Sequence, residues 1–501
     1  MEGYPENLHD ECSHTRYPNL CVQTLMGMGS GNQSADIISH LVNKTIFETM
    51  LPSSYFAEFG SLLEAQDDPQ SHSVKGYCEE LMSMSLKRLD QAMKALKSPI
   101  RNKHDVQTWL SASLTFQQTC KDYADTHGLE IISKKMDYLS ALASNPLALI
   151  NRITGIPKST KARRLLGSEE EEKFPSWVTG RERKLLQAGT VKANAIVAQD
   201  GTGNYKTISQ AIQAASGSRF VIYVKKGVYR EKIRTNKDGI TLIGEGKYST
   251  IISGDDSVKG GASMPGSATF TITGDGFIAI DIGFHNNAGP HGEQALALNI
   301  ASDRSVLYRC SIAGYQDTLY ALALRQFYRE CDIYGTIDFI FGNAAAVFQS
   351  CNLVLRRPQR GYNVILANGR TDPGQNTGFS VQKCNIMPSS DFSAVKHSFN
   401  SYLGRPWKYY SRAVIMESTI DGAISGRGWI EWPGYGSSVL KTLYFAEYAN
   451  AGPGAGTGNR VKWPGFHVIG APEAEKFTVS NFIAGNSWIP STGVTFVSGL
   501  N

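Results

Sequence analysis

Two aspartates occupy matching places in two similar segments of this chain. Residues 314–319 read GYQDTL and residues 335–340 read GTIDFI, so Asp317 and Asp338 are equivalent positions 21 residues apart. If this spacing is one repeat of a solenoid, the two carboxyl groups lie on neighbouring parallel strands, about 4.8 Å apart. Two carboxyl groups that close cannot both ionise easily, so we expect one pKa to rise and the other to stay low. The pair would place a proton donor beside an anionic nucleophile or base.

Other polar and aromatic residues suit the same chemistry. Gln294 precedes Gln316 by 22 residues, again one repeat, so two neutral amide donors should stack beside the carboxyl groups. Such donors suit the oxyanion of an acyl transfer. Arg405 is suited to bidentate pairing with a carboxylate, and Trp407 to stacking on a sugar ring. Each feature also has a structural interpretation, as turn aspartates, a ladder of amides, or packing.

The segment that must position these residues reads as short strands. From Ala195 onward, apolar runs of β type alternate with clusters of Gly, Asn and Asp. The runs lie at 220–224, 240–243, 269–272, 277–282, 295–300, 306–311 and 347–355. Cys310, Cys331 and Cys351 follow the same spacing as the aspartates, and offsets of about 20 to 22 residues suit one coil of a parallel β-helix. We therefore expect an all-β solenoid.

Residues 20–150 have a helical periodicity instead. Apolar residues recur there at spacings of three and four, and glycine is sparse, which favours an antiparallel helical bundle. We expect one disulfide between Cys12 and Cys21 to close a short N-terminal hairpin. A second, between Cys78 and Cys120, would tie neighbouring helices.

Composition and charge support two globular domains. The 501 residues are 41% hydrophobic and 19% charged, a length that exceeds one ordinary core. Residues 187–501 hold 29 Lys and Arg against 22 Asp and Glu, a net charge of +7, whereas residues 1–186 have a net charge of −2. The basic C-terminal part suits an anionic ligand. No run of about 18 apolar residues predicts a membrane span.

Several features favour an oxidising extracellular compartment. The cysteine count is even, with none in a C-x-x-C spacing, and Asn32 and Asn43 begin glycosylation sequons. The first twenty residues are acidic rather than apolar, so we expect any secretion signal to lie upstream of this chain.

Charged blocks separate the two parts between about residues 155 and 190, which indicates an exposed linker. It contains two basic-basic-Leu-Leu sites that look like protease recognition sites. They are Arg163-Arg164-Leu165-Leu166 and Arg183-Lys184-Leu185-Leu186. We expect a helical domain over 1–152, a processing linker over 153–189 and a catalytic domain over 190–501.

Five spaced motifs in the C-terminal part resemble the signature segments of plant pectin methylesterases (pectinesterases). They are GVYRE at 227–231, QALAL at 294–298, GYQDTLY at 314–320, DFIFG at 338–342 and LGRPW at 403–407. Residues 10–150 resemble the pectin methylesterase inhibitor domain that many of these enzymes carry as a pro-region. The resemblance implies a right-handed parallel β-helix catalytic domain preceded by an all-α four-helix-bundle pro-domain. It also implies an ester hydrolase that demethylesterifies homogalacturonan in the cell wall and releases methanol.

The resemblance also implies a role for each site residue. Asp338 is the expected nucleophile, and Asp317 is the expected proton donor and later the base. Gln294 and Gln316 would hold the oxyanion, and Arg405 would keep Asp338 ionised and oriented. Gln294 and Arg405 are also expected to bind substrate. The expected sugar-groove residues are Trp407, Phe341, Tyr320 and Trp429.

The implied partners are methylesterified pectin, the chain's own or a separate inhibitor domain, and a subtilisin-like processing protease. No nucleic acid, metal or cofactor is implied. Among the later cysteines, Cys331 and Cys351 are the preferred disulfide pair because they lie one coil apart. Cys310 is equally close to Cys331 by the same spacing, and no partner is assigned to Cys384.

Two other functions use the same features. A glycoside hydrolase that cleaves pectin also uses paired carboxylates, but the Gln pair and the LGRPW segment argue against it. Alternatively, the protein acts chiefly as an inhibitor through its helical bundle. We expect the bundle to be autoinhibitory until the linker is cut.

Overall fold

The computed structural model describes residues 6–26, 34–50, 69–153, 193–359 and 361–500. The chain divides into two compact units. The first comprises Met1–Glu169 with Thr371–Asn376, and the second comprises Glu170–Arg370 with Thr377–Asn501. The predicted processing sites at 163–166 and 183–186 and the sequon asparagine Asn32 lie outside the described residues.

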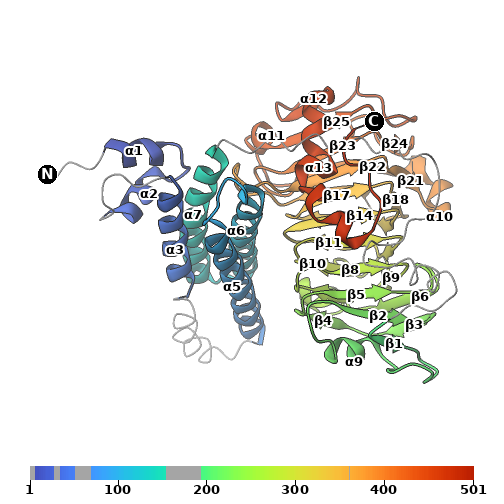
Figure 1. Ribbon diagram of the computed structural model, residues 1–501. Coiled ribbons are helices and arrows are strands. Elements are labelled where there is room, and N and C mark those ends of the chain that lie inside the picture. Colours follow the sequence, from blue (N-terminus) through green and yellow to red (C-terminus); the bar gives the residue numbers. More distant parts are fainter. Residues whose placement is uncertain (1–5, 27–33, 51–68, 154–192, 360, 501) are drawn as a thin grey trace. The chain divides into compact units, whose positions relative to one another are not determined.

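The first unit is built of helices (Figure 1). They are α1 (Glu6–Ser13), α2 (Pro18–Leu25), α3 (Ser34–Met50), α5 (Pro69–Ala95), α6 (Lys103–Thr126) and α7 (Glu130–Arg152). Helix α6 packs on α5 and α7, and α3 packs on the same two helices. Each of the four long helices therefore has two neighbours, which confirms the helical bundle predicted from the periodicity and the four-helix bundle implied by the resemblance.

Apolar side chains from every long helix fill the bundle interior. Ile38 of α3, Leu89 of α5, Leu110 of α6 and Ile150 of α7 are all fully buried in one cluster. The disulfides match the predictions, because Cys12 bonds to Cys21 and Cys78 to Cys120. The sequon residue Asn43 is exposed on α3.

Three parallel sheets form the second unit. In the described residues the first sheet has eleven strands, the second seven and the third eight. The first contains, in spatial order, β1 (Ala195–Val197), β2 (Phe220–Val224), β5 (Ile240–Ile243), β8 (Ile278–Ile280), β11 (Ser305–Tyr308), β14 (Arg325–Arg329), β17 (Ala345–Gln349), β20 (Gly378–Gln382), β23 (Arg412–Met416), β25 (Tyr444–Tyr448) and β26 (Phe466–Val468). The second contains β4 (Ile233–Thr235), β7 (Phe270–Ile272), β10 (Leu298–Ile300), β13 (Leu319–Ala321), β16 (Ile340–Gly342), β19 (Tyr362–Asn368) and β22 (Asn400–Pro406). The third contains β3 (Gly227–Arg230), β6 (Thr250–Gly254), β9 (Gly283–Asn286), β12 (Ser311–Ala313), β15 (Asp332–Gly335), β18 (Asn352–Leu355), β21 (Asn385–Pro388) and β24 (Thr419–Ile420).

Each coil contributes one strand to each sheet, as in a parallel β-helix. Strand β13, for example, pairs with β10 on one side and β16 on the other. The predicted solenoid is therefore confirmed, with its strands stacked in Figure 1. Short helices and 3-10 turns lie between and after the strands. They are α9 (Ile208–Gln213), α10 (Ser390–Ser393), α11 (Val439–Thr442), α12 (Ala471–Ala474), α13 (Val479–Phe482), η1 (Pro265–Ser267), η2 (Lys396–Ser398), η3 (Glu475–Phe477), η4 (Gly485–Ser487) and η5 (Ile489–Thr492). No helix among the described residues is both long and apolar enough to cross a membrane.

Two runs predicted as single strands are each two strands. The chain bends at Arg309, with φ 51°, between β11 and β12, and at Ser350, with φ 54°, between β17 and β18. Left-handed residues turn the chain sharply from one sheet to the next. The prediction of one strand over 306–311 and one over 347–355 is therefore wrong. The apolar residues continue through each bend, but the strand ends there and a new strand begins in the next sheet.

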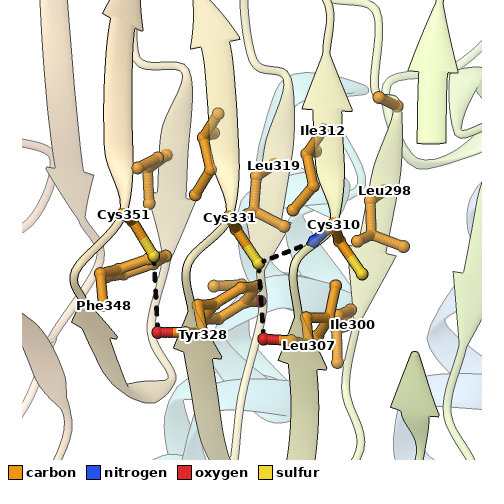
Figure 2. Close-up of a cluster of buried hydrophobic side chains, with 14 of the residues drawn as sticks. Leu298, Ile300, Leu307, Cys310, Ile312, Leu319, Tyr328, Cys331, Phe348 and Cys351 are labelled. Carbon is orange, nitrogen blue, oxygen red and sulfur yellow. Dashed lines mark hydrogen bonds between the residues drawn. The ribbon is translucent and has the colours of Figure 1, made fainter. Parts of the chain in front are cut away.

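Buried cysteines follow these bends, and the predicted Cys331–Cys351 disulfide is wrong. Cys310, Cys331, Cys351 and Cys384 are all buried free thiols. The Cys331 thiol donates to the carbonyl of Leu307 at 3.4 Å (Figure 2). Cys351 likewise donates to the carbonyl of Tyr328 at 3.5 Å. Neighbouring coils bring these residues side by side, and their thiols donate to backbone carbonyls without an S–S bond between them.

Candidate active site

Matching turns place the two predicted aspartates beside each other. Asp317 precedes β13 with φ 59°, and Asp338 precedes β16 with φ 50°. Aspartate tolerates this left-handed conformation better than most residues. Leu319 is in register with Ile340, and the Asp317 amide donates to the carbonyl of Ile337 at 3.0 Å. The predicted juxtaposition one coil apart is confirmed.

Only one of the two carboxyl groups has a cationic partner. Nε of Arg405 donates to Oδ1 of Asp338 at 2.8 Å, and Nη2 donates to Oδ2. The side chains of Arg405 and Asp338 are 10% and 7% exposed, so the pair is screened from water. Among the described residues, Asp317 has no ion-pair partner within reach. The two aspartates therefore have different surroundings despite equivalent positions.

These surroundings set the order in which the pair ionises. Burial raises the pKa of Asp317 well above its ordinary value, and the charge of Asp338 raises it further. Burial also raises the pKa of Asp338, but hydrogen bonds and charge from Arg405 oppose that rise. Our expectation that one carboxyl group keeps a low pKa is wrong, because both are buried. Asp338 nevertheless loses its proton first, which leaves Asp317 as the proton donor.

The two predicted amide residues also come together. Gln294 and Gln316 form a parallel bridge between neighbouring coils, and both are half-buried. Gln316 directly precedes Asp317, so the amide pair lies next to the carboxyl pair. The Oε1 atom of Gln294 is buried without a hydrogen-bond partner in the described part of the chain. A buried amide without its full set of partners suits a site that a ligand completes.

Three of the predicted groove residues pack on one another, with Tyr320 and Phe341 buried and Trp407 half-buried. The rings of Tyr320 and Phe341 stack with centroids 4.3 Å apart, and the Trp407 ring meets Phe341 edge-on at 5.9 Å. Trp407 also lies against the backbone at Gly369, where an added Cβ would be 2.7 Å from the indole. The structure thus groups three of the four aromatic residues predicted for the sugar groove.

Comparison with known protein families agrees with this geometry. Residues 194–486 match the family described as Pectinesterase. The chain belongs to the pectinesterase family. Residues 6–149 match the family described as Plant invertase/pectin methylesterase inhibitor, so this pectinesterase carries an inhibitor-like helical unit.

Relatives of the pectinesterase cover nearly its whole length. It is 52% identical over 497 residues to "Probable pectinesterase/pectinesterase inhibitor 54" of Arabidopsis thaliana, which is 95% of this chain and 90% of that protein. It is 48% identical to "Pectinesterase 2" of Citrus sinensis over 508 residues, 99% of this chain and 96% of that one. Among solved structures, pectin methylesterase from carrot is 49% identical with a TM-score of 0.61, covering 62% of this chain and 99% of its own.

Trp429 does not line the groove of this pectinesterase, which corrects its predicted role. Its indole is fully buried, stacks on Phe445 at 4.4 Å and donates to Oε1 of Glu447 at 3.1 Å. The backbone of Trp429 pairs with that of Gly404 in a parallel bridge. Gly404 and Arg405 are consecutive in a strand and face opposite sides of the sheet, so the Trp429 side chain lies on the opposite face from Arg405. The missing side chain of Gly404 leaves the space that the indole occupies, since a Cβ there would lie 2.9 Å from the ring.

Two residues at the site were missed by the sequence reasoning. The hydroxyl of Tyr362 accepts a hydrogen bond from Nη1 of Arg405 at 2.9 Å, and the Trp432 ring lies 4.0 Å from the Arg405 guanidinium carbon. Trp432 lies three residues after Trp429, outside any strand, so no periodic pattern marks it. Tyr362 lies in no recognised motif. No cluster of metal-ligating side chains occurs among the described residues.

Proposed function

We propose that this pectinesterase hydrolyses the methyl esters of homogalacturonan through a covalent intermediate on Asp338. The observation that carries the proposal is the asymmetry of the carboxyl pair. Asp338 is held by Arg405 and ionises first, whereas Asp317 lies one coil away without a cation of its own. An anionic nucleophile beside a protonated acid is what acyl transfer from an ester requires.

In the first half-reaction, a carboxylate oxygen of Asp338 attacks the carbonyl carbon of the methyl ester. The side-chain amides of Gln294 and Gln316 stabilise the negative charge that develops on the carbonyl oxygen. Asp317 donates its proton to the methoxy oxygen as the C–O bond breaks, and methanol leaves. The product on the enzyme is an anhydride between Asp338 and the galacturonate carboxyl group.

In the second half-reaction, Asp317 is a carboxylate and acts as the base. It removes a proton from water while the water oxygen attacks the anhydride carbonyl. Cleavage of the anhydride releases the free galacturonate and regenerates the Asp338 carboxylate, and Asp317 is protonated again. Arg405 favours this step because it stabilises the carboxylate of Asp338 as the leaving group.

Substrate recognition is assigned to the aromatic rings beside the carboxyl pair. The half-buried ring of Trp407 offers a flat apolar surface for a sugar ring or an ester methyl group, and the buried rings of Phe341 and Tyr320 pack behind it in turn. The net positive charge of residues 187–501 attracts the anionic pectin that the reaction produces. Added salt should therefore weaken binding of the product more than binding of fully methylated pectin.

We also propose that the helical domain, residues 1–152, is an inhibitory pro-region. The match to the inhibitor family supports this role. A subtilisin-like protease would cut the linker over 153–189 at one of its two basic-basic-Leu-Leu sites and free the catalytic domain over 190–501. We further infer secretion to the cell wall, with glycans at Asn32 and Asn43. Cleavage of the full chain at either site should raise methanol release, and a chain with both sites changed should stay inactive.

The proposed reaction is tested by measuring methanol and new reducing ends in the same sample of highly methylated pectin. The full chain is assayed intact and after cleavage in the linker. An esterase releases methanol and creates no reducing ends, because the polymer backbone stays intact. Reducing ends without methanol would indicate a glycoside hydrolase. If neither form releases methanol while the intact chain inhibits an added pectinesterase, the protein is an inhibitor.

A further inference from the structure

The guanidinium of Arg405 reaches across a strand to hold Asp338. Arg405 lies on β22, Asp338 precedes β16, and β19 runs between these two strands. Neighbouring strands are about 4.8 Å apart, so the side chain spans roughly 10 Å of sheet. The β19 residue in register with Arg405 is Ala367, whose small side chain leaves room for the crossing.

An arginine side chain that crosses a strand needs contacts that fix it. Its rotatable bonds otherwise give it many conformations, and only a few present both nitrogens to the carboxylate. In this structure the third nitrogen, Nη1, donates to the hydroxyl oxygen of Tyr362 at 2.9 Å. The guanidinium carbon lies over the ring of Trp432, 4.0 Å from the ring centre. All three guanidinium nitrogens of Arg405 therefore donate to a partner, two of them to Asp338 and one to Tyr362.

We propose that Tyr362 is a positioning residue of the active site, whose hydroxyl fixes Arg405 so that Asp338 stays oriented and ionised. The inference rests on the proposed nucleophilic role of Asp338. Tyr362 is the first residue of β19, the strand that lies between Arg405 and Asp338. Its hydroxyl therefore contacts the guanidinium from the strand that the arginine side chain crosses. Its own ring is held edge-on by Tyr402 at 5.9 Å, which limits its movement.

The effect should appear in the pH dependence of catalysis. The charged and titratable groups that bear on Asp338 are Asp317, Arg405 and, through Arg405, Tyr362. Without the tyrosine hydroxyl, Arg405 visits conformations that do not pair with Asp338. The carboxylate then loses part of the stabilisation that opposes its burial, so its pKa rises. Catalysis then begins at a higher pH.

The test compares Tyr362→Phe with wild type in whichever form of the full chain, intact or cleaved, releases methanol. We expect kcat to fall about 10-fold with KM for pectin nearly unchanged, since a hydrogen bond to a charged group is lost away from the sugar groove. The acidic limb of the pH–rate profile should move upward by about half a unit to one unit. Tyr223→Phe is the matched control, because its hydroxyl donates to Glu245 at 2.8 Å outside the site.

The outcomes separate this inference from the proposed function. A Tyr362→Phe enzyme with the thermal stability of wild type but a shifted acidic limb supports the positioning role. An unmoved acidic limb overturns it, whether or not kcat falls, provided that Asp338→Ala is inactive. If Asp338→Ala keeps full activity, the proposed nucleophile itself is wrong. A shift of the limb in Tyr223→Phe as well would also overturn the positioning role, since the effect would then not be specific to the site.

Discussion

Replacing Arg405 with glutamine should change the pH at which this pectinesterase begins to work. The variant keeps a polar side chain but removes the positive charge and both nitrogens that hold Asp338. Asp338 remains buried with its side chain 7% exposed, and Asp317 remains beside it. Nothing then opposes the rise in its pKa that burial causes, so the nucleophile holds its proton to higher pH.

The magnitude follows from the burial of the pair. Removing one partner of a buried ion pair costs about 3 to 5 kcal/mol, and one pKa unit corresponds to about 1.36 kcal/mol. The acidic limb should therefore move upward by about two units or more. The folded variant binds the proton of Asp338 more tightly than the unfolded chain does. Its stability should thus fall as pH rises from the ordinary carboxyl pKa, about 3.9, through the raised value.

The assay is kcat/KM for methanol release across the range from acidic to alkaline pH. Arg325→Gln is a matched control, because Arg325 also holds a buried aspartate bidentately, with Nε and Nη2 at 2.9 and 2.7 Å from Asp303. We expect the control to lose stability without moving the acidic limb. If Arg405→Gln lowers the rate equally at every pH, or if both variants move the limb together, the electrostatic reasoning is wrong.

Three further changes test other parts of the structure. Gly369→Ala places a Cβ 2.7 Å from the indole of Trp407, so the ring must move and KM for pectin should rise about 10-fold with little change in kcat. Glu447→Gln leaves the buried guanidinium of Arg460 without its carboxylate and should lower the free energy of unfolding by about 3 kcal/mol or more, measured by urea denaturation. Asp317→Asn removes the proton donor, so kcat should fall about 10²-fold or more and the alkaline limb of the pH–rate profile should disappear.

Each of these expectations has a result that contradicts it. Gly458→Ala is the control for the glycine change, because a Cβ there meets nothing within 4 Å, and an equal effect in both variants would exclude a role for Trp407. Unchanged stability in Glu447→Gln would show that its pair with Arg460 contributes nothing. An alkaline limb that persists in Asp317→Asn would assign that limb to another group.

The period of the solenoid explains which contacts could be predicted from the sequence. Leu319 pairs with Ile340, 21 residues on, so the spacing of Asp317 and Asp338 translated directly into contact. The next coils are longer, since Ile340 pairs with Leu366 after 26 residues and Leu366 with Gly404 after 38. The spacing alone therefore could not predict the contact between Arg405 and Asp338. That contact was predicted only from the resemblance to a known family.

Side-chain direction explains the predictions that failed. Spacing placed Cys331 beside Cys351, but both thiols donate to backbone carbonyls and no S–S bond joins them. Trp429 and Trp432 are close in sequence, yet only Trp432 lies against Arg405, because Trp429 fills the space beside Gly404. Tyr362 begins a strand after a connection of irregular length, and nothing in its neighbours marks it. Coil length and side-chain direction are set by the folded chain rather than by local pattern.

The most direct test of the account is methanol release from highly methylated pectin by Asp338→Ala, in the form of the full chain that is active as wild type. Because Asp338 forms the covalent bond to substrate in this account, kcat/KM should fall about 10⁴-fold or more in a variant that still unfolds cooperatively. A folded Asp338→Ala protein that releases methanol within about 10-fold of the wild-type rate would contradict the assignment of the nucleophile.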